Sequence, residues 1–358
     1  MDWVSVTAPF EFPNLAATYM KMTFCQHESL IASISRLRLM RKILFLFLAL
    51  SILTTFGREL RVGIIGCDTS HATAFTETWN NPQAKGHIAG FKVVAAYRGG
   101  SADIPQSVKL QDDVVPKLKE KYGVTFYDSI EELCKNVDVV CLESLDGRPK
   151  LEQIKPVLKA GKPVFVDKPF GAALKDAKEI FRLANEARVP IFTSSSLRFA
   201  KNTQAVRGGA IGVVTNATTF GPCETDPHHP EMYWYGIHGI EALFTVMGTG
   251  CENVRRGTNA NGKIEVVGKW SGGRIGVFTE DKDFRGNAAG VKGGMAVGKW
   301  DGYVPLVEAI SKFFQTGIVP VKQEETLEIY AFMDAVEESR NKEGAFVLLP
   351  AAKGIMGQ

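Results

Sequence analysis

Short apolar runs alternate with amphipathic segments over residues 58–195. Runs rich in β-branched residues are predicted as buried strands at 61–65, 92–96, 124–127, 137–142, 163–166 and 190–193. Helical periodicity lies between them, near 70–80, 112–121, 129–135, 149–159 and 173–187. In the last segment, Ala177, Ile180, Phe181 and Ala184 form an apolar stripe at helical spacing. The alternation predicts an α/β, Rossmann-type dinucleotide-binding domain with a doubly wound parallel sheet.

After residue 195 the pattern changes. Strands follow one another without helices in "GVVTNATTFGP" and in "KIEVVGKW" and "RIGVFTE", which read as a hairpin across residues 271–273. Helices are predicted near 234–248, 303–315 and 323–340, and the Gly- and Lys-rich stretch 280–300 is predicted as a mobile loop. Residues 196–358 are thus expected to form a C-terminal α+β domain with an open antiparallel sheet, which favours a homo-oligomer.

Residues 40–57 have the pattern of an export signal peptide. A basic pair precedes the apolar run 43–53, and small or polar residues follow it. The run is too short to span a bilayer. Because Met40 stands directly before the basic pair, residues 1–39 are predicted to be an upstream extension, either a start assigned too early or a disordered segment. We predict export to the periplasm, with no membrane span in the mature form.

Composition adds mainly exclusions. The 358 residues are 45% apolar and 23% charged, with a net charge of +3, and no basic run is interleaved with aromatics. We therefore predict no nucleic-acid partner. The six cysteines contain no C-x-x-C pair and are expected to be single buried thiols.

The first strand leads into a degenerate dinucleotide-binding fingerprint. Of the three glycines in G-x-G-x-x-G only Gly66 is present, since Asp68 and His71 replace the other two. A carboxylate about 4 Å from a phosphate costs roughly 1 kcal/mol in water and about 4 kcal/mol at an intermediate dielectric. The helix N-terminus, with Thr69 and Ser70, opposes that cost, and Asp68 could also turn away to cap the helix.

The second strand ends in Tyr97-Arg98-Gly99-Gly100-Ser101, without the acid that binds the ribose of NAD. An arginine there can pair with a 2′-phosphate, so NADP is favoured over NAD. A solvated surface arginine is the alternative.

"GKPVFVDKPFG" at 161–171 places Asp167-Lys168-Pro169 at the end of a strand. With the opening strand and the order of the two domains, this motif resembles the Gfo/Idh/MocA oxidoreductase family, whose signature here is Glu-Lys-Pro. The resemblance covers most of residues 60–349. It implies that Lys168 lies between the nicotinamide and the substrate hydroxyl, where an ammonium stabilises alkoxide charge.

The resemblance also points to "MYWYGIHGIEALFTVMG" as the second catalytic segment. His238 matches the family's catalytic histidine and is predicted to take the hydroxyl proton. The family's aspartate position holds Trp234, so that acid is absent, and Glu241 is predicted to be a retained acid of the substrate site. A helix histidine with a local hydrogen bond is the alternative for His238.

The remaining site predictions concern ligand contacts. The predicted cofactor contacts are Gly63, Gly66, Asp68, Thr69, Ser70, His71, Tyr97, Arg98, Ser101, Glu143, Ser144, Lys168 and Pro169. The predicted substrate contacts are Tyr233, Trp234 and Tyr235, whose rings suit a sugar, and Arg198, which could equally form an interdomain ion pair. The loop aromatics could instead pack at the domain interface. No metal is predicted, because His229, Glu231 and His238 match no standard ligand spacing.

We therefore expect an NAD(P)-dependent oxidoreductase that transfers hydride at a secondary alcohol of a sugar or polyol. Export argues against a freely exchanging cofactor. One alternative is a lyase or glycosidase assisted by tightly bound NAD(P). The other is a non-catalytic carbohydrate-binding protein, which the replacements at Asp68 and Trp234 favour and which Lys168, His238 and Glu241 oppose.

Overall fold

The computed structural model describes residues 58–350. The predicted upstream extension (1–39) and signal peptide (40–57) lie outside the described residues. From Glu59 onward the chain forms one compact unit that contains two sheets. Within the described part, no helix combines the length and apolarity needed to cross a membrane.

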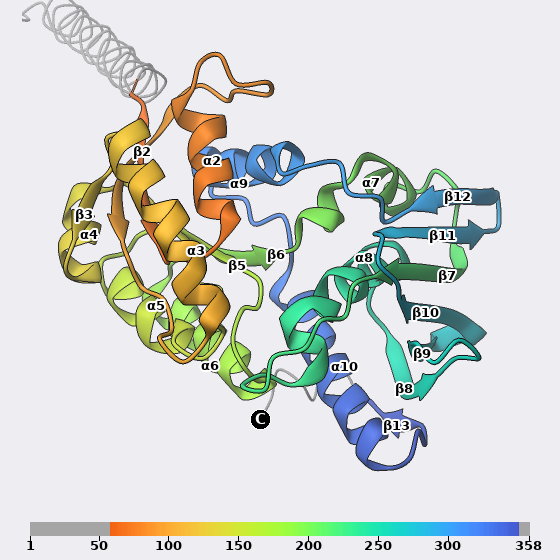
Figure 1. Ribbon diagram of the computed structural model, residues 1–358. Coiled ribbons are helices and arrows are strands. Elements are labelled where there is room, and N and C mark those ends of the chain that lie inside the picture. Colours follow the sequence, from red (N-terminus) through yellow and green to blue (C-terminus); the bar gives the residue numbers. More distant parts are fainter. Residues whose placement is uncertain (1–57, 351–358) are drawn as a thin grey trace, which may run out of the picture. The chain divides into compact units, whose positions relative to one another are not determined.

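The first sheet has six parallel strands in the order β3-β2-β1-β4-β5-β6 (Figure 1). Its strands are β1 (Leu60–Ile65), β2 (Phe91–Tyr97), β3 (Thr125–Tyr127), β4 (Val139–Leu142), β5 (Val164–Asp167) and β6 (Ile191–Ser194). The strands β4, β5 and β6 are buried throughout, which explains their continuous apolar sequences. The predicted doubly wound sheet is confirmed.

Helices connect these strands. They are α2 (Ser70–Asn80), α3 (Pro105–Pro116) with the π-helical turn η1 (Lys117–Lys121), α4 (Ile130–Asn136), α5 (Lys150–Lys159) and α6 (Leu174–Ala187). The predicted stripe of α6 is buried along its whole length. Only α3 departs clearly from prediction, because it begins at Pro105, where the proline occupies the first helical turn.

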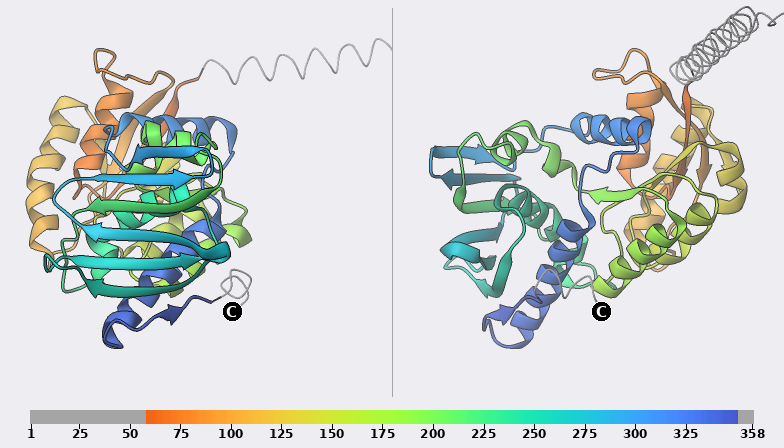
Figure 2. Two further views of the ribbon diagram at one scale, coloured as in Figure 1. Left: turned by 90° about the vertical axis from the view of Figure 1, so that its right-hand side faces the viewer. Right: turned by 180° about the vertical axis from the view of Figure 1, so that it is seen from behind.

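The turn η2 (Ser196–Phe199) and helix α7 (Lys201–Arg207) lead to a second sheet of seven strands, ordered β12-β11-β7-β10-β9-β8-β13. Its strands are β7 (Val214–Gly221), β8 (Cys251–Thr258), β9 (Ile264–Trp270), β10 (Arg274–Glu280), β11 (Arg285–Gly290), β12 (Gly293–Val297) and β13 (Val347–Leu348). The hairpin across 271–273 is confirmed. The sheet is mixed rather than purely antiparallel, since β7 and β10 run parallel. Figure 2 (left) shows one face of it without a covering helix.

The prediction of a mobile loop over 280–300 is wrong, because this segment supplies strands β11 and β12. Its small residues are required by close packing rather than by mobility. A Cβ on Gly286 would lie 2.5 Å from the carbonyl oxygen of Thr218, and one on Gly290 would lie 2.4 Å from that of Ile211.

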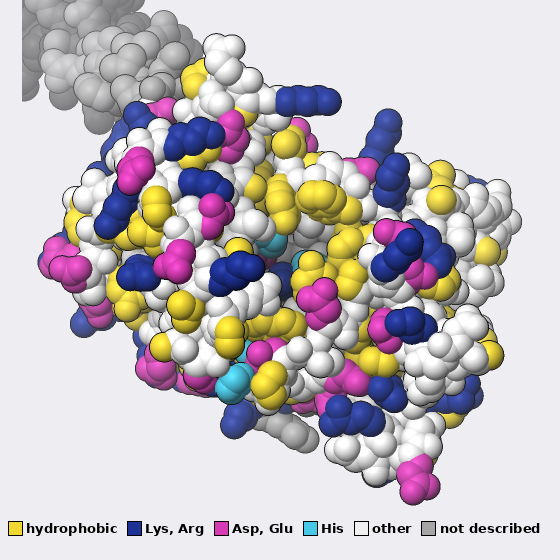
Figure 3. Space-filling view, in the orientation of Figure 1, with side chains coloured by type: hydrophobic (Ala, Val, Ile, Leu, Met, Phe, Trp, Pro, Cys, Tyr) yellow, Lys and Arg dark blue, Asp and Glu magenta, His cyan; other side chains and the backbone are white. Residues whose placement is uncertain are grey.

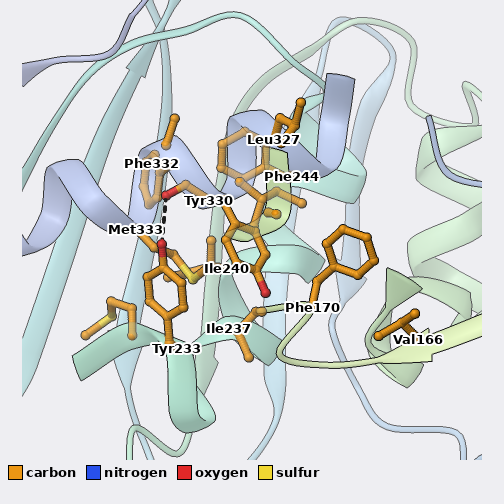
Figure 4. Close-up of a cluster of buried hydrophobic side chains, with 14 of the residues drawn as sticks. Val166, Phe170, Tyr233, Ile237, Ile240, Phe244, Leu327, Tyr330, Phe332 and Met333 are labelled. Carbon is orange, nitrogen blue, oxygen red and sulfur yellow. Dashed lines mark hydrogen bonds between the residues drawn. The ribbon is translucent and has the colours of Figure 1, made fainter. Parts of the chain in front are cut away.

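The helices of the second half bind the two sheets together. They are the π-helical turn η3 (Met232–Gly236) with α8 (Ile237–Met247), α9 (Val304–Thr316) and α10 (Gln323–Asn341). Helix α9 packs beside α2 of the first sheet (Figure 1), where Trp79 Nε1 donates to Ser311 Oγ at 2.9 Å. One apolar cluster also runs from β5 through α8 to α10 (Figure 4). This shared core fixes the carboxyl ends of the strands against α8.

Candidate active site

The turn after β1 is built around Gly66. Its φ of +94° lies in the region that favours glycine, and a Cβ there would lie 2.3 Å from the amide nitrogen of Ser144. Gly63 is also close-packed, because a Cβ on it would lie 2.7 Å from Leu133. The turn therefore keeps the tight approach of strand and loop on which the fingerprint depends.

Asp68 does not face solvent at the mouth of this turn. Its carboxylate is fully buried and accepts hydrogen bonds from Ser107 Oγ at 2.6 Å and from the amide of Leu145 at 3.1 Å. Burial raises the pKa of Asp68. The side-chain cap of α2 is Thr69, which accepts from the amide of His71 at 3.3 Å. The predicted turning away of Asp68 thus occurs, and another residue caps the helix.

The end of β2 carries the predicted adenosine contacts. Arg98 is exposed, and its Nε donates to Gln111 Oε1 at 2.9 Å. Tyr97 is half-buried, and its carbonyl accepts from the amide of Gly66 at 3.0 Å. Ser101 Oγ donates to Asp146 Oδ2 at 2.6 Å, so the loops after β2 and β4 are joined.

Glu143, directly after β4, is a buried acid without a partner. Neither carboxylate oxygen has a hydrogen bond within the described part of the chain. Burial, followed by the negative charge of Asp167, raises the pKa of Glu143 well above its ordinary value. Its neighbour Ser144 is also buried, and its hydroxyl donates to Gln153 Oε1 at 2.8 Å. Glu143 is therefore a buried carboxyl group without a hydrogen-bond partner among the described residues, and its environment favours the protonated form.

Lys168 follows β5 and precedes Pro169 through a cis peptide bond. Its side chain is buried, and no acceptor among the described residues lies within hydrogen-bond distance of the ammonium. That ammonium lies 5.5 Å from the centre of the Tyr235 ring. Burial lowers the pKa of Lys168, and the charge of Asp167 opposes that shift. A desolvated cation without a carboxylate partner can bind a developing alkoxide.

His238, on α8, lies in the same region. Its Nδ1 is 2.7 Å from Ser195 Oγ, and the rings of Tyr235 and Phe284 contact it edge-on. Burial, with the positive charges of Lys168 and His71, lowers the pKa of His238 well below its ordinary value. The imidazole is therefore neutral near pH 7.

Glu241 is one turn further along α8, and both of its oxygens are occupied. Oε1 accepts from Ser194 Oγ at 2.7 Å and from Arg198 Nε at 2.6 Å, and Oε2 accepts from the amide of Ser195 at 2.7 Å. Arg198 also bonds to Glu325 of α10 at 2.7 Å. Two roles were predicted for Arg198, a ligand contact and an ion pair, and the structure gives it the contacts of an ion pair. Glu241 also holds Ser195 in position through its backbone amide.

The three aromatic residues before α8 lie in different environments. Tyr233 is fully buried in the apolar cluster of Figure 4, where its hydroxyl donates to the Asp334 carboxylate, so it has no exposed surface for a substrate. Trp234 packs on His229 at 4.8 Å. Tyr235 alone lies against both Lys168 and His238. We retain only Tyr235 as a proposed substrate contact.

His71 and Asp167 form a contact that sequence reasoning missed. Nδ1 of His71 lies 2.6 Å from Asp167 Oδ2, and both side chains are buried. Tyr303, just before α9, packs edge-on against the His71 ring at 4.6 Å. Burial raises the pKa of Asp167, but the charge and close contact of His71 outweigh it and bring the pKa to about 2. The "DKP" motif was the available signal, but nothing in it named His71 as a partner.

Figure 3 shows a hollow at the centre of one face, with histidine and cationic side-chain atoms in its depth and apolar atoms around it. The contacts above place Lys168, His238 and Tyr235 together and set His71 close to them. These residues come from the carboxyl ends of parallel strands and from the helices facing them, where open α/β sheets bind their ligands.

The histidines and acids considered as metal ligands have other partners. His229 lies between Asp146 and Asp226, at 3.0 Å from each, and Glu231 pairs with Arg256 at 3.0 Å. Over residues 58–350, no three His, Cys, Asp or Glu side chains are grouped in a way that could hold a metal ion. The five cysteines in that range are free and buried.

Comparison with known proteins finds a family match over the first sheet and its helices. Residues 60–195 match the GFO_IDH_MocA family, described as "Oxidoreductase family, NAD-binding Rossmann fold". An uncharacterized protein of Saccharomyces cerevisiae, YMR315W, is 24% identical over 209 residues, covering 53% of this chain and 56% of that protein. The uncharacterized oxidoreductase YhhX of Escherichia coli is 27% identical over 138 residues, covering 35% of this chain and 40% of YhhX. The chain thus spans about half the length of these relatives, or less.

Among solved structures, scyllo-inositol dehydrogenase from Lactobacillus casei, with bound NAD(H) and scyllo-inositol, has a similar fold. The TM-score is 0.64 at 15% identity, over 81% of this chain and 99% of that one. Because that match extends beyond residues 60–195, it shows that both sheets follow a known two-part fold.

Proposed function

From the premise that residues 60–195 belong to the Gfo/Idh/MocA oxidoreductase family, we propose that the protein is an NAD(P)-dependent oxidoreductase that transfers hydride at a secondary alcohol. The observation that carries this proposal is the Lys168 ammonium, which is buried without a carboxylate partner beside Tyr235 and near His238.

The residues present fit a nicotinamide dinucleotide. Gly66 keeps the tight turn against Ser144, and the first amides of α2 have no acceptor within the helix. The His71 amide is bonded to the Thr69 hydroxyl, which leaves the other first amides available to a diphosphate. Asp68 is bonded inside the protein, and burial raises its pKa, which favours the uncharged acid and weakens the repulsion of that anion. The unpartnered Glu143 lies at the end of β4, where a polar ligand group would satisfy it. Bound there, an oxidised nicotinamide supplies the hydride acceptor.

The side chains around the hollow supply the rest of the chemistry. Lys168 holds the reacting oxygen and stabilises negative charge on it as the hydroxyl proton leaves. Tyr235 offers a ring face for the apolar C–H surface of a cyclic polyol. His238 presents Nε2, because Nδ1 is bonded to Ser195. The sequence prediction gives the proton to this histidine.

A sugar or polyol is the proposed substrate class. The site combines a cation, a neutral imidazole and aromatic rings, which together suit a hydroxylated ring. The similar fold of an enzyme whose structure holds scyllo-inositol supports this class and leaves the individual substrate open.

A second candidate, a lyase or glycosidase with retained NAD(P), is favoured by contacts that close the loops around the cofactor region. Asp146 accepts from Ser101 and pairs with His229 of the loop before η3, and Arg148 pairs with Asp103 at 2.8 Å. These bonds join the loops after β2 and β4 to the second half of the chain. A cofactor enclosed by them would exchange slowly, which suits a reaction that regenerates it within each cycle.

Lys168→Ala tests the proposal. We expect turnover of a panel of inositols and pyranoses to fall by about 10²–10³ or more while NAD(P) binding persists. Lys168→Met, which keeps the length of the side chain, should behave like Lys168→Ala, and the control Lys175→Ala on α6 should behave like wild type. Wild-type rates in both Lys168 variants contradict the role. Sugar binding without any turnover would favour the non-catalytic carbohydrate-binding alternative.

Assembly and export complete the proposal. The uncovered face of the second sheet carries exposed apolar side chains such as Ile275, and we propose that it pairs with a second copy of the chain. Sedimentation should show a homo-oligomer that Ile275→Lys weakens. We also propose export through residues 40–57, which N-terminal sequencing of the mature secreted protein would test. A chain still beginning before residue 40 would contradict it.

A further inference from the structure

His71 occupies the fingerprint position where a glycine normally lets helix and strand pack closely. Its ring instead fills the space between α2 and the residues before α9. The ring stacks near Phe75 at 5.6 Å, contacts Tyr303 edge-on at 4.6 Å and directs Nδ1 to Asp167 Oδ2 at 2.6 Å. The close contact of Nδ1 with the Asp167 carboxylate does not meet hydrogen-bond geometry, but it leaves Nε2 as the ring nitrogen without a polar contact among the described residues.

The groups that face His71 belong to the same site. Lys168 is the next residue after Asp167, and Lys168 and His71 both lie close enough to His238 to influence its pKa. The Tyr303 ring contacts the His71 ring edge-on. Burial, together with the charges of Asp167 and Tyr235, raises the pKa of the Tyr303 hydroxyl. His71 is therefore a second imidazole beside the oxygen-binding ammonium, reached from the side of the first sheet.

We propose that His71, held by Asp167, is the residue that accepts the hydroxyl proton. This inference rests on the proposed function. The O–H bond breaks, its proton bonds to Nε2 of His71 and the C=O bond forms. An oxidised nicotinamide, when bound, would accept the hydride from the carbon. Asp167 is a positioning residue that also stabilises the imidazolium.

The environment of His238 makes it the weaker proton acceptor. Its Nδ1 faces the Ser195 hydroxyl rather than a carboxylate, and the positive charge of Lys168 acts on it more strongly than the negative charge of Asp167. No carboxylate of residues 58–350 contacts His238 directly, so a positive charge on it would be buried without a bonded counterion. His71 has the counterion that His238 lacks, and this difference decides between two imidazoles near the same ammonium.

His71→Ala is the decisive variant, because a small residue at this position restores the usual packing of the fingerprint. We expect NAD affinity measured by calorimetry to be unchanged. The kcat for inositol or pyranose oxidation should fall by about 10²–10⁴, and added imidazole should restore part of it. His87→Ala, which removes a histidine bonded to the Thr78 carbonyl, is the matched control and should keep wild-type kcat.

Two outcomes separate the hypotheses. If His71→Ala loses NAD affinity but keeps wild-type kcat at saturating NAD, His71 is a cofactor ligand and the inference is overturned. If the wild-type protein neither binds NAD nor oxidises any polyol, the proposed function fails instead.

A second readout needs no cofactor or substrate. In the nucleotide-free protein, the proton between His71 and Asp167 should give a strongly downfield NMR resonance. We expect that signal to disappear in Asp167→Asn and in His71→Ala and to persist in His238→Gln. A signal that survives Asp167→Asn would show that the carboxylate does not hold the ring.

Discussion

The segment where β5 ends beside α2 differs from helix α8 in how its buried carboxylate is used. Asp167 contacts one imidazole through Oδ2, and its Oδ1 has no hydrogen-bond partner among the described residues. Glu241 is equally buried, but both of its oxygens are occupied by serines and by Arg198. The comparison shows that the acid in the predicted catalytic segment has only structural contacts, whereas the acid that we propose to position a proton acceptor lies at the end of β5.

The largest loss of stability should come from removing the Glu241 carboxylate on α8. Glu241→Gln removes one of the two carboxylates that pair with Arg198, and breaking a buried ion pair by removing one partner costs about 3–5 kcal/mol. We expect the free energy of unfolding, measured with denaturant, to fall by that amount. Asp167→Asn should cost less stability, because the Asp167 carboxylate contacts only the His71 ring and pairs with no Arg or Lys among the described residues. Equal losses in the two variants would contradict the comparison.

Glu143 extends the comparison to an acid with no partner. Its folded-state pKa is raised, so above the ordinary value of 4.5 the folded protein retains a proton that the unfolded chain releases. The stability contributed by this group is therefore present at low pH and falls as pH rises, by up to about 1.4 kcal/mol per pH unit. Glu143→Gln imitates the protonated acid, so it should match wild type near pH 4 and become more stable above it. Unfolding curves that coincide at every pH would show that Glu143 ionises freely in the fold.

The smallest expected effect concerns cofactor choice at the end of β2. Arg98 uses only Nε on Gln111, so its terminal nitrogens remain available to a 2′-phosphate. We expect Arg98→Ala to weaken NADP binding by about tenfold, one charge-assisted hydrogen bond, with little change for NAD. Arg98→Lys should fall between them. Parallel changes for both nucleotides would leave Arg98 without a role in this choice.

The fold was largely predictable because buried parallel strands are written as continuous apolar runs, and the strands and α6 lie close to their predicted positions. Strands β11 and β12 were missed because they are rich in Gly and Ala, which have low strand propensity. Small residues are needed there because neighbouring backbone packs closely against them. The parallel pairing of β7 with β10 depends on long-range register, which local patterns do not encode.

At the site, the motifs around Lys168 and His238 were enough to predict that these two residues lie in one region. The partners of each side chain were not predictable. Spacing on α8 suggested that Glu241 faces the substrate, whereas Arg198 and the serines after β6 take up its oxygens. His71 was predicted only as a cofactor contact, because the fingerprint is a local motif. Its contact with Asp167 could not be predicted, because Asp167 lies far along the chain.

Calorimetric titration with NAD and with NADP, alongside mass spectrometry of nucleotide released on denaturation, tests the central claim most directly. The account predicts saturable binding of a nicotinamide dinucleotide or its release from the purified protein, despite Asp68 in the glycine turn. Flat titrations with both nucleotides, together with no released nucleotide, would contradict it.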